Sequence, residues 1–268
     1  MRFMTWNINS VRLRIGLLTE LLEEYSPDIV CLQETKVPDE LFPAFEIEAA
    51  GYPHMHYHGM KAYNGVAILS RVSFSAKEIW HHCGRQDCRH AAVSLKHEKL
   101  AGPLEVHCIY VPAGGNEPDP EINEKFAHKL EFVEEMTQWF RENYSPEDHI
   151  IALGDFNIAP LENDVWSHRQ LLNVVSHTPA EVQRLKAMQS SLDWQDITRH
   201  FISPEEKAYT WWSYRNRDWK KSNRGRRLDH IWLTRPLLPY LESCEILREF
   251  RDRESPSDHV PVITDLSF

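Results

Sequence analysis

The chain has 268 residues, of which 42% are hydrophobic and 26% are charged, and its formal net charge is −10 at pH 7. This balance is ordinary for globular proteins, so a large core is possible and disorder is not indicated. Because no run of about 18 apolar residues is present, we expect no membrane span. The first residues become polar too early for a secretion signal, and the five cysteines show no disulfide spacing, so we expect a cytoplasmic protein.

Short apolar runs recur along the chain, and each has a length typical of a buried strand. Residues 10–25 carry a leucine-rich stripe with Ser10 as a helix N-cap, and residues 123–143 form a longer amphipathic pattern. Residues 162–172 and 179–192 are weaker helical patterns. Because strands occur with and without helices between them, we expect mixed sheets with helices outside, in one domain over residues 1–268. The expected strands cover residues 3–8, 29–32, 65–69, 91–95, 104–110, 150–153, 228–233 and 260–263.

Polar side chains follow these strands at the points where the strands end. After residues 150–153 come Asp155 and Asn157, which face the same way in an extended chain. The similar endings of MTWNIN and LGDFNIA also indicate an internal pseudo-repeat. Sites on sheet proteins gather in a crevice at one set of strand ends. We therefore expect a shared pocket formed by Asn7, Glu34, Tyr110, Asp155, Asn157, Asp229, Asp258 and His259.

Four members of this set are carboxylates, which repel one another in a shared pocket. At ~4 Å and an effective dielectric constant of ~20, each like-charge pair costs about 4 kcal/mol. A divalent cation would relieve this repulsion, and oxygen ligands without cysteine favour Mg²⁺ or Mn²⁺ over zinc. His259 beside Asp258 is typical of an acid–base or orienting pair. Any one of these residues alone is more commonly a cap or turn residue, but their combination favours a catalytic site.

The polar strand ends also carry a resemblance to a known family. In chain order, TWNINSVR (5–12), DIVCLQETK (28–36), YVPAGG (110–115), LGDFNIAP (153–160), NRGRRLDHIWL (223–233) and SPSDHVPV (255–262) resemble the exonuclease III family of Mg²⁺-dependent AP endonucleases. This family is the DNA-repair branch of the endonuclease/exonuclease/phosphatase superfamily. The resemblance implies an α/β fold, a four-layer sandwich of two packed mixed sheets flanked by helices.

The resemblance further implies an activity and a partner. The expected partner is duplex DNA with abasic sites or 3′ ends, acted on by a monomer. The expected reactions are cleavage 5′ to an abasic site, 3′→5′ exodeoxyribonuclease action, and removal of 3′ blocking groups as a phosphodiesterase or phosphatase. Phosphoryl cleavage by metal and charged side chains suits this reaction class.

The family's functional residues carry over onto matching positions. Glu34 is implied as the main metal ligand, Asp155 as the acid or base, and Asn157 as the amide that positions phosphate or nucleophile. Tyr110 matches the active-site tyrosine, and Asp229 with His259 matches the family's Asp–His pair. Whether Asp155 activates water or protonates the leaving 3′ oxygen stays open. The full set of implied metal-site residues is Asn7, Glu34, Asp155, Asn157, Asp258 and His259.

A basic segment at residues 215–227 has five Arg and two Lys against one Asp in this otherwise acidic chain. A charge run is usually a solvated face. Aromatic residues interleave with these cations, and that mixture suits phosphate contact together with base stacking. We expect DNA contact by Trp211, Arg215, Arg217, Lys220, Lys221, Arg224 and Arg226.

Arg226 departs from the family pattern, which has an apolar or aromatic residue there as a wall of the pocket for the baseless sugar. Trp211 and Leu228 match the other walls. An arginine at this place could reach a phosphate, or fold back and leave the pocket wider. The balance between exonuclease and AP endonuclease activity therefore stays open.

Three alternatives compete with these expectations. The stretch HHCGRQDCRH (81–90) contains Cys83 and Cys88, but zinc ligand pairs are usually spaced more tightly and repeated elsewhere, so a polar loop is favoured. A phosphoesterase of the same superfamily acting on inositol phosphates, lipids or RNA tails is a second possibility. A catalytically dead DNA-binding scaffold is a third, although every matched position is filled.

Overall fold

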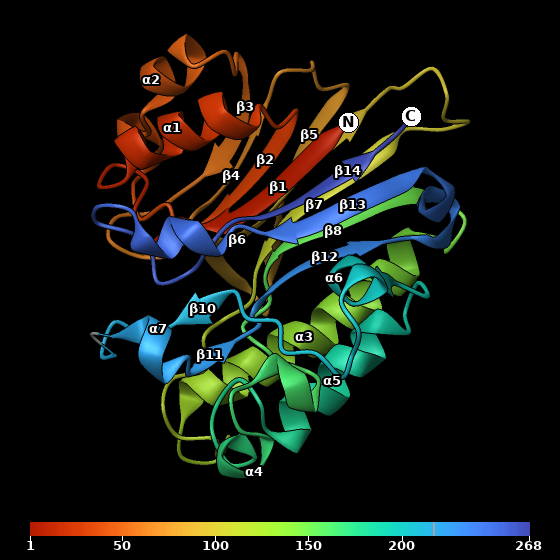
Figure 1. Cartoon of the computed structure of the whole chain (residues 1–268). Helices are drawn as coiled ribbons and strands as arrows, with labels where there is room; N and C mark the ends of the chain where they lie inside the picture. Colours follow the sequence, from red (N-terminus) through yellow and green to blue (C-terminus); the bar gives the residue numbers. More distant parts are fainter. Residues whose placement is uncertain (217) are drawn as a thin grey trace.

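In the part of the chain that the structure describes, residues 1–216 and 218–268 of a computed structural model, two six-stranded sheets lie face to face (Figure 1). The first sheet has the strand order β13-β14-β1-β2-β4-β3 and the second β5-β6-β7-β8-β12-β9. In the first sheet the strands are β1 Arg2–Asn7, β2 Ile29–Gln33, β3 His54–His58, β4 Val66–Ser70, β13 Leu241–Ile246 and β14 Val262–Leu266. In the second they are β5 Ala76–His82, β6 Arg85–Leu95, β7 Leu104–Tyr110, β8 His149–Asp155, β9 Gln195–Asp196 and β12 Asp229–Leu233.

The two sheets share one pairing pattern. In each, a parallel pair lies at the centre, β1 with β2 and β8 with β7, and the other neighbours are antiparallel. Strands β1 and β8 therefore occupy equivalent positions in their sheets. The similar endings MTWNIN and LGDFNIA come from these two strands, so the pseudo-repeat of the sequence corresponds to a repeat of structure.

The central strands are buried on both faces, which explains why they read as continuous apolar runs. In β8, Ile151 and Leu153 enter the core between the two sheets, whereas Ile150 and Ala152 pack under the helices of the second sheet. In β1, Phe3 faces the other sheet. Burial of each large apolar side chain contributes about 1.5–3 kcal/mol.

Helices cover both outer surfaces and complete four layers, as the sequence predicted (Figure 1). Helix α1 Ile15–Tyr25 and α2 Ala44–Ala49 lie over the first sheet, and α3 Glu124–Asn143 and α5 Pro179–Gln189 over the second. Asn123 caps α3, and Thr178 with Glu181 forms a capping box at α5. Three short helices lie in the connections: α4 His168–Leu171, α6 Ile197–Phe201 and α7 Trp219–Ser222.

The first helix begins later than the sequence predicted. It starts at Ile15, and Ser10 has φ 86°, outside the helical region, so Ser10 is not its N-cap. The preceding turn is held by the buried Arg14, whose guanidinium donates to Ile8 O at 3.2 Å and to Pro256 O at 3.0 Å. This tertiary anchor overrides the local helical pattern.

The expected helix over residues 162–172 is broken for a similar reason. A short 3₁₀ helix, Glu162–Asp164, is followed by α4. The buried Asp164 carboxylate accepts hydrogen bonds from Arg227 at 2.7 and 2.9 Å and from Arg199 at 2.5 Å. Arg227, one of the cations of the basic segment, is therefore a core residue and not a surface charge.

A small two-stranded ribbon lies near the ends of the central strands. It pairs β10 Trp211–Trp212 with β11 Gly225–Arg226. Single bridges join Trp211 to His259 and Arg226 to Val165, so the ribbon is fixed next to the last strand. Among the described residues, none of the helices has the length and apolar character needed to cross a membrane.

Candidate active site

The strand ends of both sheets meet at one point, as the sequence predicted. Asn7 ends β1, and its Nδ2 donates to Glu34 Oε1 at 2.9 Å and to Asp155 Oδ2 at 2.8 Å. Tyr110, the last residue of β7, donates its hydroxyl to Glu34 Oε1 at 2.9 Å. Burial, with Glu34 and Asp155 nearby, raises the pKa of Tyr110 well above its usual value, so its hydroxyl remains a donor. Asn7 thus links the two sheets directly through their carboxylates.

The turn after β8 places Asn157 against Asp155. Asn157 has φ 52°, a left-handed conformation that Asn tolerates well. Its backbone N–H donates to Asp155 Oδ1 at 2.9 Å, and its Nδ2 donates to Asp155 Oδ2 at 3.0 Å and Val111 O at 2.9 Å. The segment is therefore an Asx-type turn, and this same turn holds the carboxylate and the amide together.

His259 lies between two buried aspartates. Its Nδ1 is 2.8 Å from Asp229 Oδ2, and its Nε2 is 3.7 Å from Asp155 Oδ2. Burial opposes the charged ring, but Asp229 and Asp155 raise the pKa of His259 to about 10. Burial raises the pKa of Asp155 to about 7, with His259 opposing and Asp229 adding to the shift. The imidazole is thus held as a cation beside a carboxyl group that can exchange a proton near neutral pH.

Asp258 and Glu34 are held by a second group of contacts. Asp258 accepts from Asn9 Nδ2 at 3.0 Å and from Trp211 Nε1 at 2.9 Å. Lys36 Nζ lies 2.6 Å from Glu34 Oε2 and donates to Asn9 Oδ1 at 2.6 Å. Although burial alone would raise the pKa of Glu34, Lys36 and the hydrogen bonds hold that pKa below its usual value. Glu34 is therefore ionised at neutral pH.

These groups suit a hard divalent cation. The hydrogen-bonded cluster places four carboxylates against two cationic side chains, Lys36 and His259, among the described residues, so a net negative charge remains. The donors are carboxylate and amide oxygens, the ligand type that Mg²⁺ and Mn²⁺ prefer. Glu34, Asn157, Asp258 and His259 line a cleft of about 500 Å³, whereas Asn7, Tyr110, Asp155 and Asp229 are buried behind them.

The walls of the cleft combine aromatic and basic side chains. The Arg224 guanidinium carbon is 4.7 Å from the centre of the Trp166 ring, and that of Arg226 is 5.2 Å from the centre of the Trp211 ring. Leu228 also lines the cleft. Such arginine–tryptophan pairs offer both charge and a flat apolar surface.

Arg226 folds back, which is one of the two outcomes left open by the sequence. Its Nη1 donates to Val175 O at 2.9 Å and to Ser176 Oγ at 2.7 Å. It still lines the cleft beside Trp211, so it takes part in forming the wall.

Comparison with known proteins agrees with this geometry. Residues 4–259 match the Endonuclease/Exonuclease/phosphatase family. The chain belongs to that family. It is 29% identical over 271 residues to the exodeoxyribonuclease III of Haemophilus influenzae, with 98% of each chain covered. Two solved structures align over 100% of both chains: an AP endonuclease from Archaeoglobus fulgidus (30% identity, TM-score 0.90) and the 3′ phosphatase NExo from Neisseria bound to a product DNA hairpin (28% identity, TM-score 0.89).

The basic segment of this family member is less uniform than its sequence indicates. Arg215 is exposed and lines the cleft. Lys220 is exposed but pairs with Asp252 at 2.7 Å, and Lys221 is exposed on α7. Arg217 lies outside the described residues. The segment therefore offers cationic groups both at the cleft and on the adjoining helix.

Sequence reasoning missed Lys36 and also a buried lysine behind Asn157. Lys129 Nζ donates to Asn157 O at 2.8 Å and lies 2.5 Å from Glu181 Oε1. A signal was present, because Lys129 falls on the apolar stripe of residues 123–143 between Phe126 and Val133. A charge at such a position implies a buried partner. Lys36 could have been noticed two residues after Glu34.

Proposed function

We propose that this chain is a DNA-repair nuclease that hydrolyses DNA phosphodiesters with the help of Mg²⁺ or Mn²⁺. The proposed activities are 3′→5′ exodeoxyribonuclease action on duplex DNA, cleavage 5′ to abasic sites, and removal of 3′ blocking groups. The observation that carries the proposal is the buried Asp229–His259–Asp155 row, of which His259 lines a cleft walled by arginine and tryptophan. We further propose that residues 1–268 act as one monomeric domain.

The cation would be held chiefly by Glu34, with Asp258 nearby. Asn7 would orient the Glu34 carboxylate through the 2.9 Å hydrogen bond that it donates. Asp155, Asn157 and His259 complete the proposed set of residues around the cation. When bound, such an ion neutralises phosphate charge and orients the oxygen atoms that exchange at phosphorus.

The protein groups would divide the remaining work. In the reaction a bond forms between a water oxygen and phosphorus, and the bond from phosphorus to the 3′ oxygen breaks. The positively charged His259, supported by Asp229, would stabilise negative charge on the phosphate. Asp155, with a pKa of about 7, suits transfer of a proton from the attacking water or to the leaving oxygen. Asn157 and Tyr110 would position the phosphate and Glu34.

DNA would follow the basic and aromatic wall of the cleft. The proposed interactions are phosphate binding by the cations and stacking or wedging by tryptophan. Substituting Lys220→Ala together with Lys221→Ala should reduce the slope of log affinity against log salt by roughly 0.9 for each phosphate that the protein no longer neutralises. The proposed DNA-binding residues are Trp211, Arg215, Arg217, Lys220, Lys221, Arg224 and Arg226.

The decisive experiment compares four duplexes: one with a single abasic site, one with a recessed 3′ end, one with a 3′ phosphate, and one intact. Each is incubated with wild-type protein and with Glu34→Gln, first with Mg²⁺ and then with excess EDTA. Cleavage should require the cation and should be lost in Glu34→Gln. Cleavage that survives EDTA would refute the metal-dependent mechanism, and binding of DNA without any cleavage would support the scaffold alternative.

A further inference from the structure

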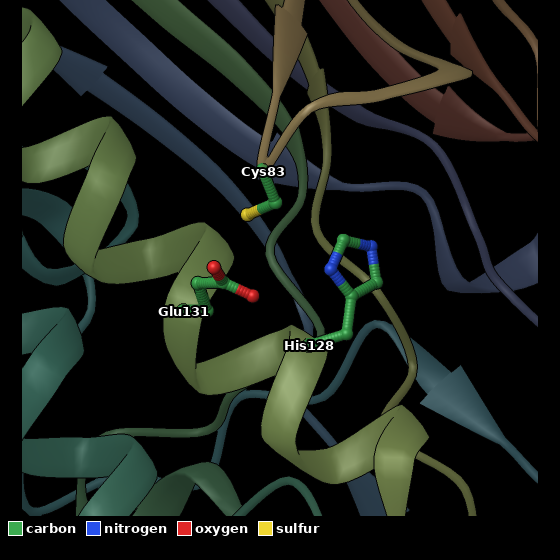
Figure 2. Close-up of side chains that lie close together, drawn as sticks. All are labelled: Cys83, His128 and Glu131. Carbon is green, nitrogen blue, oxygen red and sulfur yellow. The ribbon is translucent and has the colours of Figure 1, made fainter.

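The turn between β5 and β6 brings a cysteine against helix α3, away from the strand ends described above. Figure 2 shows Cys83 from this turn and His128 and Glu131 from α3, with their side chains directed toward a shared space. A sulfur, a ring nitrogen and a carboxylate oxygen from these residues lie within 4.8 Å of one another. Cys88, the other cysteine of this stretch, is not part of the group among the described residues.

His128 is aimed into this group with a free nitrogen. The residue is only 6% exposed, and its Nδ1 is buried without a hydrogen-bond partner among residues 1–216 and 218–268. Its other nitrogen, Nε2, lies 3.4 Å from Asp87 Oδ2. A proton on Nε2 would be shared with that carboxylate, which leaves the lone pair on Nδ1. An imidazole held by a carboxylate in this way is the usual arrangement of a metal-binding histidine.

The backbone holds the cysteine in place. Cys83 has φ 56°, and its N–H donates to Glu135 Oε2 at 2.7 Å. His128, Glu131 and Glu135 are three and four residues apart, so they share one face of α3. The same helix face therefore anchors the turn and supplies two of the three candidate ligands.

The local charge favours a cation. The Glu131 carboxylate belongs to the group, and the Glu135 carboxylate accepts from the Cys83 N–H, so two negative charges lie beside the thiol and the imidazole. A divalent metal would supply the positive charge that these groups lack. Sulfur, imidazole nitrogen and carboxylate oxygen together match the ligand preference of zinc, which takes four ligands in a tetrahedron.

We propose that Cys83, His128 and Glu131 bind one Zn²⁺ ion, with a water molecule as the fourth ligand. Binding replaces the thiol proton, which is released to solvent. The ion would fasten the β5–β6 turn to α3. Asp87 would support the site by orienting His128.

Cobalt offers a direct test, because a thiolate bound to Co²⁺ gives a charge-transfer absorption band. The full chain carrying Glu34→Gln, which removes the main ligand proposed at the other site, is stripped of metal and titrated with Co²⁺. We expect the band at one equivalent, its loss in Cys83→Ser and in His128→Gln, and its retention in the matched control Cys88→Ser. Circular dichroism of each variant verifies folding.

Zinc affinity gives the second readout. Displacement of Co²⁺ by Zn²⁺ should remove the band, and Asp87→Asn should weaken Zn²⁺ binding by about 10–100-fold, as loss of a supporting carboxylate usually does. A missing band in the Glu34→Gln protein, or a band that persists in Cys83→Ser, would overturn the proposal. Equal Zn²⁺ affinity in His128→Gln would overturn it as well.

Discussion

His259 illustrates how single residues set the chemistry of this molecule. Its ring is charged because Asp229 and Asp155 flank it, and it lines the cleft. We expect His259→Ala to lower turnover on an abasic-site duplex by about 10²–10⁴-fold, the usual contribution of a charge-stabilising or proton-transferring group. Single-turnover cleavage measures the change, and fluorescence anisotropy should show that DNA binding is retained. The exposed His200→Ala serves as control, and near wild-type cleavage by His259→Ala would show that the site is assigned wrongly.

Arg226 is the residue from which we expect control of substrate choice. In Arg226→Trp the hydrogen bonds to Val175 and Ser176 are removed, and an indole replaces the guanidinium beside Trp211. An apolar wall should favour the baseless sugar, so abasic-site cleavage should rise relative to 3′→5′ degradation. Both rates are measured on one duplex, with and without the lesion, and Arg224→Trp is the matched control. An unchanged ratio of abasic-site cleavage to 3′→5′ degradation would mean that residues other than Arg226 determine substrate choice.

At this scale the sequence predicted which polar residues meet, but not how they are held. Asp155 and Asn157 stand out in the sequence because both closely follow the apolar run of residues 150–153. The contact of Lys36 with Glu34 depends on two left-handed residues, with φ 53° at each, and local propensity does not reveal such a conformation. Arg226 could not be placed because its partners, Val175 and Ser176, are about 50 residues away.

Among the elements, α3 connects the second sheet to the site through Lys129. We expect Lys129→Met to leave Glu181 buried without its cation, and breaking such a pair typically costs about 3–5 kcal/mol. The free energy of unfolding, from urea titration, measures this loss.

Lys129 also positions Asn157, so the turnover of its variants tests a role beyond stability. Adding Glu181→Gln to Lys129→Met should recover much of the stability, because the unpaired charge is removed. Turnover should fall in Lys129→Met and should stay low in the double variant, because in both the Asn157 carbonyl oxygen lacks the Lys129 partner that lies at 2.8 Å in the wild type. Recovery of both quantities together would mean that Lys129 serves stability alone.

Helices and strands with a clear apolar pattern were predicted well. Helix boundaries that depend on buried charges bonded to distant parts of the chain were not. The α3 pattern over residues 123–143 and the eight apolar runs correspond to elements of the structure. The late start of α1 and the break after Asp164 follow from buried arginines, Arg14 and Arg227, that bond to distant parts of the chain. Amphipathic periodicity carries no information on such partners.

The whole molecule carries several buried neutral histidines, and these make its stability depend on pH. Burial lowers the pKa of His107 to about 3, and burial with Arg227 nearby lowers that of His230 to about 4. In the unfolded chain both residues titrate near pH 6.5. Between about pH 6.5 and 4 the unfolded state therefore binds more protons, so stability falls as the pH falls, by at most about 1.4 kcal/mol per pH unit for each histidine.

Urea unfolding at pH 7.0, 6.0 and 5.0 checks this expectation. His107→Gln should show a smaller decrease between pH 7 and 5 than wild type, whereas the exposed His200→Gln should follow wild type. An equal decrease in His107→Gln and wild type would mean that the His107 ring is charged in the folded protein.

The order of strands and helices predicted mixed sheets with helices outside. The four-layer sandwich itself was implied by the resemblance of the sequence motifs to the exonuclease III family. Contacts between segments that are far apart in the sequence were harder to predict. Cys83 meets His128 across 45 positions, whereas the sequence alone relates Cys83 only to its close neighbours. Three-dimensional proximity of that kind depends on how α3 lies across the second sheet.

Finally, the reacting groups come from both sheets and lie at the boundary, here called the seam, where the two sheets pack face to face. Asn7 and Glu34 come from one side and Tyr110 and Asp155 from the other, so a small slip of the seam changes every distance in the site. Misplacement by 1 Å can cost about 10²-fold in rate.

Substitutions at two adjacent residues of β8 test how strongly turnover depends on the packing between the sheets. Ile151 packs in the seam and Ile150 packs under the helices, and both are fully buried. Each Ile→Val substitution should cost about 0.5–1.5 kcal/mol of stability. Only Ile151→Val should also lower turnover. Equal turnover in the two variants would show that a change of packing between the sheets does not affect catalysis. In such a nuclease the packing of one sheet against the other sets the distances between the reacting groups.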